Sequence, residues 1–177
     1  MNIQVALEKK QLECSEGMNH LLIHLCGSDI SEIDNFQLHL TLPKGINALK
    51  NLNHLIEDTD HTVTILHLHE DTDLIFELFT GDRIPLDQLL ITVTLSYRLR
   101  SQLYESKKRV PLMIVSEEIS DQIMIDSEIA SRVAKIKSES EKEPHSFVSL
   151  PVLQQLENEH SPLEEKYRIQ SSYEIIQ

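Results

Sequence analysis

Apolar and polar residues alternate along much of the first two thirds of the chain, which is the pattern of half-buried β-strands. The longest such run is LLITVTLSYRL, residues 89–99, and it contains neither glycine nor proline. Read at a period of two, it has an apolar face that carries Leu89, Ile91, Val93, Leu95, Tyr97 and Leu99. Branched residues suit a pleated surface and are stiff in a helix. We therefore predict that this run is the central strand of the core.

Six further strands are predicted by the same alternation, with turn residues between them. They cover residues 3–7, 20–26, 36–42, 62–69, 74–79 and 110–115. The first two predict a hairpin that turns at Ser15-Glu16-Gly17, whereas residues 46–61 predict a loop with one short helical turn and residues 100–108 a turn. Seven short strands without helical patterns between them predict a mainly β fold, an antiparallel sandwich of two sheets over about residues 1–116.

The remaining residues, 117–177, predict an acidic helical extension, because 13 acidic and 6 basic residues follow Val115. Asp126 or Ser127 can cap a helix over residues 126–137 that has Ile129, Val133 and Ile136 on one face. Residues 138–148 predict a linker. Two further helices are predicted to begin near residues 149 and 161, the second at the capping box Ser161-Pro162-Leu163-Glu164. These helices either pack on the sandwich or fold onto a partner.

Charge and cysteine content restrict the classes of partner and compartment. The formal net charge of the 177 residues is -13, which argues against nucleic acid or an anionic membrane, because binding to phosphates requires an excess of cations. The first residues carry early charges and no long apolar core, so we expect a cytoplasmic protein. If residues 3–26 form the predicted hairpin, Cys14 and Cys26 lie about 20 Å apart, and both thiols are expected to be reduced.

Histidine supplies the one candidate cluster for metal binding. His67 and His69 would point to the same side of a strand, and His20, His24 and His39 occupy two other predicted strands. Such pairs occur in metal sites, but solvated histidines on a polar sheet face are the simpler explanation and the one that we favour. The chain lacks the motifs GxSxG, HExxH, GxxxxGKS and GxGxxG. We therefore predict no enzyme activity, no cofactor and no metal ligands.

Four segments, FQLHLTLPKGI, DLIFELF, ITVTLSYRL and VPLMIV, resemble the accessory immunoglobulin-like sandwich domains of bacterial multidomain proteins over about residues 34–115. The resemblance implies an immunoglobulin-like fold and a role in binding or spacing. Together with the absent motifs, it predicts a non-enzymatic module for protein interaction or assembly that binds a protein partner or itself. The alternatives are a sandwich that binds a metal or small ligand through its strand histidines, and a structural subunit of a larger assembly. The predicted partner-binding residues of the extension are Val152, Leu153, Leu156, Tyr167, Tyr173 and Ile176.

Overall fold

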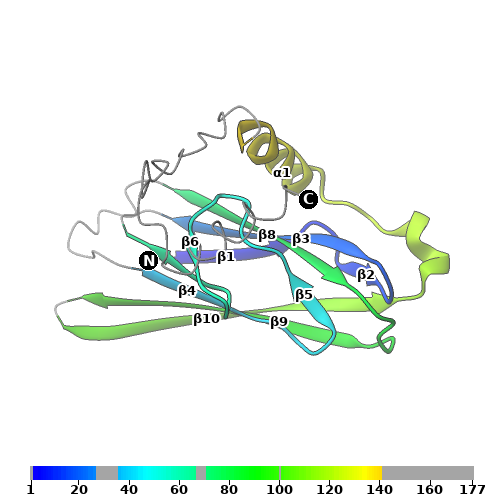
Figure 1. Cartoon of the computed structure of the whole chain (residues 1–177), viewed down its shortest axis with the longest axis horizontal. Helices are drawn as coiled ribbons and strands as arrows, with labels where there is room; N and C mark the ends of the chain where they lie inside the picture. The colour runs from blue at the N-terminus through cyan, green and yellow to red at the C-terminus, as the bar shows by residue number, and fades with distance from the viewer. Residues whose placement is uncertain (1, 27–35, 67–70, 100, 141–177) are drawn as a thin grey trace, which may run out of the picture. The chain divides into compact units, whose positions relative to one another are not determined.

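Two β-sheets face each other across a common apolar core in this computed structural model (Figure 1). The structure describes residues 2–26, 36–66, 71–99 and 101–140, which lie in a compact unit that spans Met1–Lys142. The first sheet has the strand order β1-β3-β8-β5 and the second has the order β2-β10-β9-β4-β7-β6. The first sheet contains β1 (Asn2–Leu7), β3 (Met18–Cys26), β5 (Ile46–Ala48) and β8 (Thr72–Thr80).

The second sheet holds the two longest strands. Its members are β2 (Gln11–Glu13), β4 (Phe36–Thr41), β6 (Ile56–Glu57), β7 (Thr62–Ile65), β9 (Gln88–Leu99) and β10 (Gln102–Val115). This strand order matches an immunoglobulin sandwich. The order β1-β3-β8-β5 corresponds to its ABED sheet, and the order β10-β9-β4 corresponds to its GFC sheet. The hairpin β6-β7 is an insertion that adds to β4, and β2 pairs in parallel with the end of β10. The predicted mainly β, immunoglobulin-like fold is confirmed.

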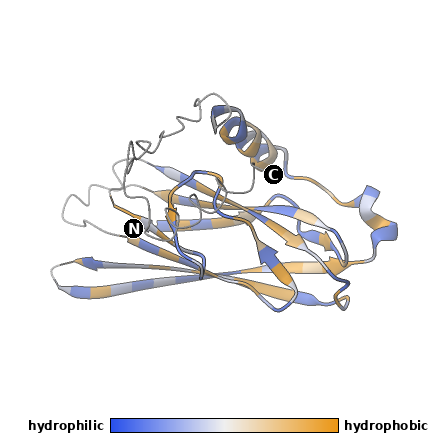
Figure 2. Cartoon of the chain, viewed as in Figure 1, coloured by the Kyte–Doolittle hydropathy of each residue, from blue (hydrophilic) through white to orange (hydrophobic). Residues whose placement is uncertain are grey.

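The core lies between the inner faces of the two sheets. Ile91 and Val93 of β9 are fully buried and Leu95 is 1% exposed, which confirms the predicted inner face of this strand at its centre. Leu89, Tyr97 and Leu99, at the two ends of the same face, are partly buried against the core. Polar and apolar positions alternate along β9 (Figure 2), as a strand covered on one face requires.

The predicted antiparallel pairing of the first two strands is confirmed, because β1 pairs with β3. Their connection is more than a turn: the chain crosses to the second sheet, where β2 pairs with β10, before it returns. Two further predictions about the loops are wrong. Residues 46–61 contain β5 and β6 rather than a loop with a helical turn. The polar residues 101–108 do not all form a turn: β10 begins at Gln102 and continues the hairpin with β9. The first half of β10 is exposed on both faces, so no alternation of apolar residues marks it in the sequence.

A helix covers the outer face of the first sheet (Figure 1). After the 3₁₀-helix η1 (Glu117–Gln122), α1 (Ser127–Ser140) begins at the predicted cap, where the side chain of Asp126 accepts hydrogen bonds from the N–H groups of Glu128 and Ile129. Because α1 continues to Ser140, the first residues of the predicted linker are helical. The rest of that linker and the two later helices lie outside the described residues, and the division into 1–116 and 117–177 stays a prediction.

Candidate functional site

The outer face of the first sheet combines a small apolar contact with charged side chains. Ile129 and Val133 of α1 pack against Leu22 of β3 and Ile75 of β8, and all four side chains are buried. This contact fixes the helix over the middle of the two strands. Polar residues at neighbouring outward-facing positions of β3 and β8 lie on either side of this apolar contact, within reach of side chains of α1.

His24 of β3 belongs to one of these polar groups. Its Nδ1 atom lies 2.7 Å from Oδ1 of Asp73, its pairing partner in β8. Arg132 of α1 donates two hydrogen bonds to the same carboxylate, at 3.1 and 2.9 Å, and a third to Glu128 at 2.7 Å. The hydrogen bond to Glu128 and the negative charge of Asp73 raise the pKa of the Arg132 guanidinium. Asp73 is thus held between a histidine and a permanently charged guanidinium.

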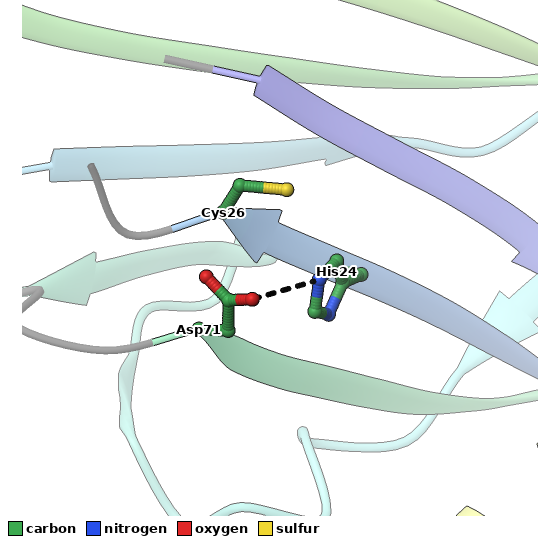
Figure 3. A group of neighbouring side chains, drawn as sticks. All are labelled: His24, Cys26 and Asp71. Atoms are coloured by element: carbon green, nitrogen blue, oxygen red, sulfur yellow. Dashed lines mark ion pairs between the residues drawn. The ribbon is translucent and has the colours of Figure 1, made fainter.

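His24, Cys26 and Asp71 lie together at the end of β3 and the start of β8 (Figure 3). One ligand atom from each side chain lies within 4.8 Å of the other two. Nε2 of His24 faces Oδ2 of Asp71 at 3.7 Å, which is the ion pair drawn in Figure 3. We call these three residues the His24 cluster. Imidazole, thiolate and carboxylate are all transition-metal ligands.

His20, four residues earlier on the same face, lies between two carboxylates. Its Nδ1 atom contacts Glu8, and its Nε2 atom lies 3.4 Å from Glu77, to which Lys137 of α1 donates a hydrogen bond of 2.7 Å. Partial burial favours the neutral form of Glu77, but the hydrogen bond and charge of Lys137, with a smaller effect of His20, lower its pKa below the ordinary value of 4.5. Glu77 is therefore a carboxylate at neutral pH and a second anchor for α1.

The structure separates the histidines that the sequence grouped. His20 and His24 share the outer face of the first sheet, whereas His39 lies on β4 of the second sheet, with its Nδ1 atom 3.0 Å from Oγ1 of Thr62. His39 cannot converge with His20 or His24, because it belongs to the other sheet of the sandwich. His67 and His69 lie outside the described residues. The proximity of Cys26 and Asp71 to His24 was not predicted, although His24 and Cys26 have the i, i+2 spacing that puts two side chains on one face of a strand.

A second candidate region is the open edge of β10. Only the last three residues of β10, Met113–Val115, pair with β2, and within the described residues no strand pairs with the same side of β10 between Gln102 and Leu112. A groove of about 920 Å³ lies beside this edge, between β10, β1 and the residues that precede α1. Apolar side chains dominate its lining, among them Val5, Leu7, Val110, Pro111, Met113, Met124 and Ile125. Met124 and Ile125 are 86% and 57% exposed.

Cations line the open edge of this acidic protein. Lys107, Lys108 and Arg109 are consecutive exposed residues of β10, and Lys10 lines the groove. Lys107 forms an exposed ion pair with Glu105 on the same strand. Lysine and proline, here Pro111, commonly keep an edge strand from pairing indiscriminately with other strands. The predicted partner-binding residues Val152, Leu153, Leu156, Tyr167, Tyr173 and Ile176 lie outside the described residues, so their role stays a prediction.

No protein-family model matches this sequence, and no curated protein matches it. Among solved structures, the chain is similar to BcpA, the major pilin subunit of Bacillus cereus, with a TM-score of 0.52 and 14% sequence identity over 64% of this chain and 40% of BcpA. The chain is an immunoglobulin-like β-sandwich. Domains D2 and D3 of the major pilin SpaD from Corynebacterium diphtheriae give a TM-score of 0.48 and 12% identity over 62% of this chain and 51% of that chain.

The similarity to BcpA agrees with the predicted resemblance to accessory immunoglobulin-like domains and, at 14% identity, it establishes the fold alone. The chain spans well under half the length of BcpA. No helix in the described part of the chain is both long and apolar enough to cross a membrane.

Proposed function

We propose that this chain is a non-enzymatic module for protein interaction and assembly, and that it binds an extended, acidic segment of a protein partner along the open edge of β10. The single observation that supports the proposal most strongly is the unpaired side of residues 102–112, which reaches an apolar groove at Val110 and Pro111. An extended segment that pairs with this edge would place side chains over the groove where it passes these two residues, as in other cases of β-strand addition.

The charge of the edge favours an acidic segment. Lys107, Lys108 and Arg109 would repel the cations of a basic partner strand at this edge. Carboxylates opposite them would neutralise that charge and speed association. A partner segment with acidic residues alternating with apolar ones fits both the edge and the lining of the groove.

The acidic extension is proposed to add a second contact through the apolar residues predicted above. Self-association is the second candidate function, because the fold is shared with BcpA, a pilin subunit, and this chain carries acidic segments of its own after Val115. A structural subunit of a larger assembly and a module that docks on a different protein would use the same edge. We propose the cytoplasm as its location, which fractionation of the native cell would test.

Site-specific photo-cross-linking in the native cell tests the proposed edge. A photoreactive residue at Ser106 or Val110 is expected to capture an acidic peptide, identified by mass spectrometry, whereas the same group at Gln37, on the exposed outer face of the second sheet, is the matched control. A captured peptide from this same chain would assign self-association. Equal capture at Gln37, or capture only there, would contradict the proposal.

Charge reversal provides an independent test with the full chain. The triple variant Lys107→Glu, Lys108→Glu, Arg109→Glu is expected to lose the cross-link, whereas Lys44→Glu with Lys50→Glu, a change of charge elsewhere on the surface, is expected to keep it. Replacement of Leu153, Leu156 and Tyr173 by serine tests the extension separately. An unchanged set of partners in that variant would remove the role proposed for the extension and leave the edge proposal intact.

A further inference from the structure

Three potential metal ligands meet where β3 ends and β8 begins. His24 and Cys26 are two residues apart in β3 and so point to the same outer face. Antiparallel pairing joins His24 to Asp73 and Leu25 to Thr72, and continuing that register sets Asp71 opposite Cys26. The backbone register of the sheet therefore brings the three residues to the same corner of its outer face.

We propose that the His24 cluster binds a divalent transition-metal ion of the zinc type. One nitrogen, one sulfur and one oxygen ligand form a mixed set that suits zinc, a metal of borderline softness, and three protein ligands leave a fourth tetrahedral position for water or another ligand. A set made only of carboxylates would instead favour magnesium or calcium. The thiolate of Cys26 is thus the ligand that selects the class of metal.

A second carboxylate already orients the histidine ligand. If Nδ1 of His24 donates its proton to Asp73, at 2.7 Å, then Nε2, which faces Asp71, would be the nitrogen that binds the ion. Metal-binding histidines commonly donate their other N–H to a carboxylate, which fixes the tautomer and the ring orientation. Arg132 in turn holds Asp73 at 2.9 Å, so a residue of α1 supports the site from above the sheet. A solvated surface histidine would not require this chain of hydrogen bonds from Arg132 through Asp73 to His24.

The distances fit a site that closes slightly around its ion. Ligand atoms of a tetrahedral zinc site lie about 3.2–3.7 Å from one another, given metal–ligand distances of about 2.0–2.3 Å. The three ligand atoms here lie within 4.8 Å of one another, and Nε2 of His24 and Oδ2 of Asp71 are already 3.7 Å apart. The side chain of Asp71 is 61% exposed, so a rotation about its side-chain bonds can close the remaining distance without moving the sheet.

A metal ion at this position would connect β3 to β8 at the end of their pairing. Because the ligands are brought together only by the folded sheet, the ion would bind the folded state in preference to the unfolded state and raise the melting temperature. We expect a rise of about 5–10 °C at a free zinc concentration 100-fold above the dissociation constant. The affinity would fall at low pH, since protons compete for the ligand atoms.

Zinc titration of the full-length protein, reduced with a phosphine that does not itself bind zinc strongly, tests the site. We expect one equivalent to bind with a dissociation constant in the micromolar range or below, and cobalt to give the thiolate-to-metal absorption that a coordinated Cys26 requires. His24→Gln and Cys26→Ser should each lower the affinity at least 100-fold. Asp73→Asn, which alters only the residue that orients His24, should lower it by about 10–100-fold.

Matched variants separate this site from other histidines and thiols. His39→Gln changes a half-exposed histidine of the other sheet, and Cys14→Ser changes the buried thiol, so neither should alter zinc affinity. Circular dichroism of each variant checks that the sandwich is folded. The proposal is overturned if the folded wild-type protein binds no zinc at micromolar concentrations, if cobalt gives no thiolate band, or if His67→Gln with His69→Gln abolishes binding while Cys26→Ser leaves it unchanged.

Discussion

The outer faces of the two sheets differ in what lies on them, although the strands of both alternate in the same way. The first sheet presents Leu22 and Ile75, which α1 covers, with the polar residues His20, His24, Asp73 and Glu77 on either side. The second sheet presents mainly polar side chains on β4 and the middle of β9, whereas β10 and the start of β9 add exposed apolar residues such as Leu90 and Pro111. The polar side chains are those of Gln37, His39, Thr41, Thr92, Thr94 and Ser96.

This difference shows that a few apolar residues on an outer face can be enough to add a helix to a sandwich as a third layer. Two apolar residues at outward-facing positions of neighbouring strands create a patch that water solvates poorly, and a helix with Ile129 and Val133 on one face buries it. Arg132 and Lys137 then pair with carboxylates of the sheet, which determines where along the strands the helix lies. The outer face of the second sheet also has an apolar pair at neighbouring positions, Leu90 of β9 and Pro111 of β10, but no helix in the described part of the chain covers it.

The largest loss of stability is expected from a substitution in the core between the two sheets. Val93 is fully buried in β9, so Val93→Asp places an unpaired charge between the sheets and should reduce the free energy of unfolding by at least about 4 kcal/mol. Most of a typical domain's stability would be lost. The neighbouring change Thr94→Asp, on the outer face opposite Lys107, should cost less than about 1 kcal/mol. Urea unfolding followed by circular dichroism measures both, and an unchanged melting temperature for Val93→Asp would refute the inward placement.

Removal of apolar contact beneath α1 should have the next largest effect and should be local. Val133→Ala deletes two methyl groups from a buried position over Leu22 and Ile75 and is expected to cost about 1–2.5 kcal/mol. Lys135→Ala, on the exposed side of the same helix, should change stability by less than about 0.5 kcal/mol. Hydrogen exchange should show faster exchange of α1 amides in Val133→Ala with unchanged protection of β9. Equal acceleration in both elements would mean that the helix is not a separable layer.

The sequence predicts the parts of this fold that have a local pattern. Period-two alternation identifies β1, β3, β4, β8 and β9, and the Asp126 cap with its apolar stripe identifies α1. Strands of two or three residues, such as β5 and β6, are too short to show a period, and they exist because the longer strands beside them supply hydrogen-bond partners. The first half of β10 shows no alternation because both of its faces are solvated, and its partner β9 alone defines it as a strand.

The candidate metal site could be predicted only in part, for a related reason. The spacing of His24 and Cys26 is visible in the sequence and places both on one face of a strand. Asp71 and Asp73 are 45 or more positions away, and only the register between β3 and β8 brings them to that face. A shift of that register by one residue would turn both carboxylates to the core side. The sequence leaves open whether His24 and His39 converge, because it does not show that their strands belong to different sheets.

The ion pair that anchors the middle of α1 should contribute less than its apolar contact. Asp73→Asn removes the charge that Arg132 and His24 share, and we expect a loss of about 0.5–1 kcal/mol, because both side chains are partly exposed and water weakens the interaction. A double-mutant cycle with Arg132→Met isolates the pair. Glu128→Gln, which removes the more exposed partner of Arg132, should have little effect. A coupling energy between Asp73 and Arg132 that is no larger than that between Glu128 and Arg132 would contradict this ranking.

The smallest predicted effect is acid sensitivity at the other anchor of α1. The pKa of Glu77 in the folded protein is below 4.5, its ordinary value, so the folded state binds fewer protons at this group than the unfolded state does. Its contribution to stability is therefore fully present above pH 4.5 and is lost as the pH falls through the folded-state value. Lys137→Met should remove most of this dependence, with a change below about 1 kcal/mol because Lys137 is 43% exposed. Lys135→Met is the matched control. Unfolding curves measured between pH 6 and 3 should differ from those of the wild-type protein only for Lys137→Met. If the free energy of unfolding depends on pH equally in all three proteins, Glu77 does not link the helix to the sheet.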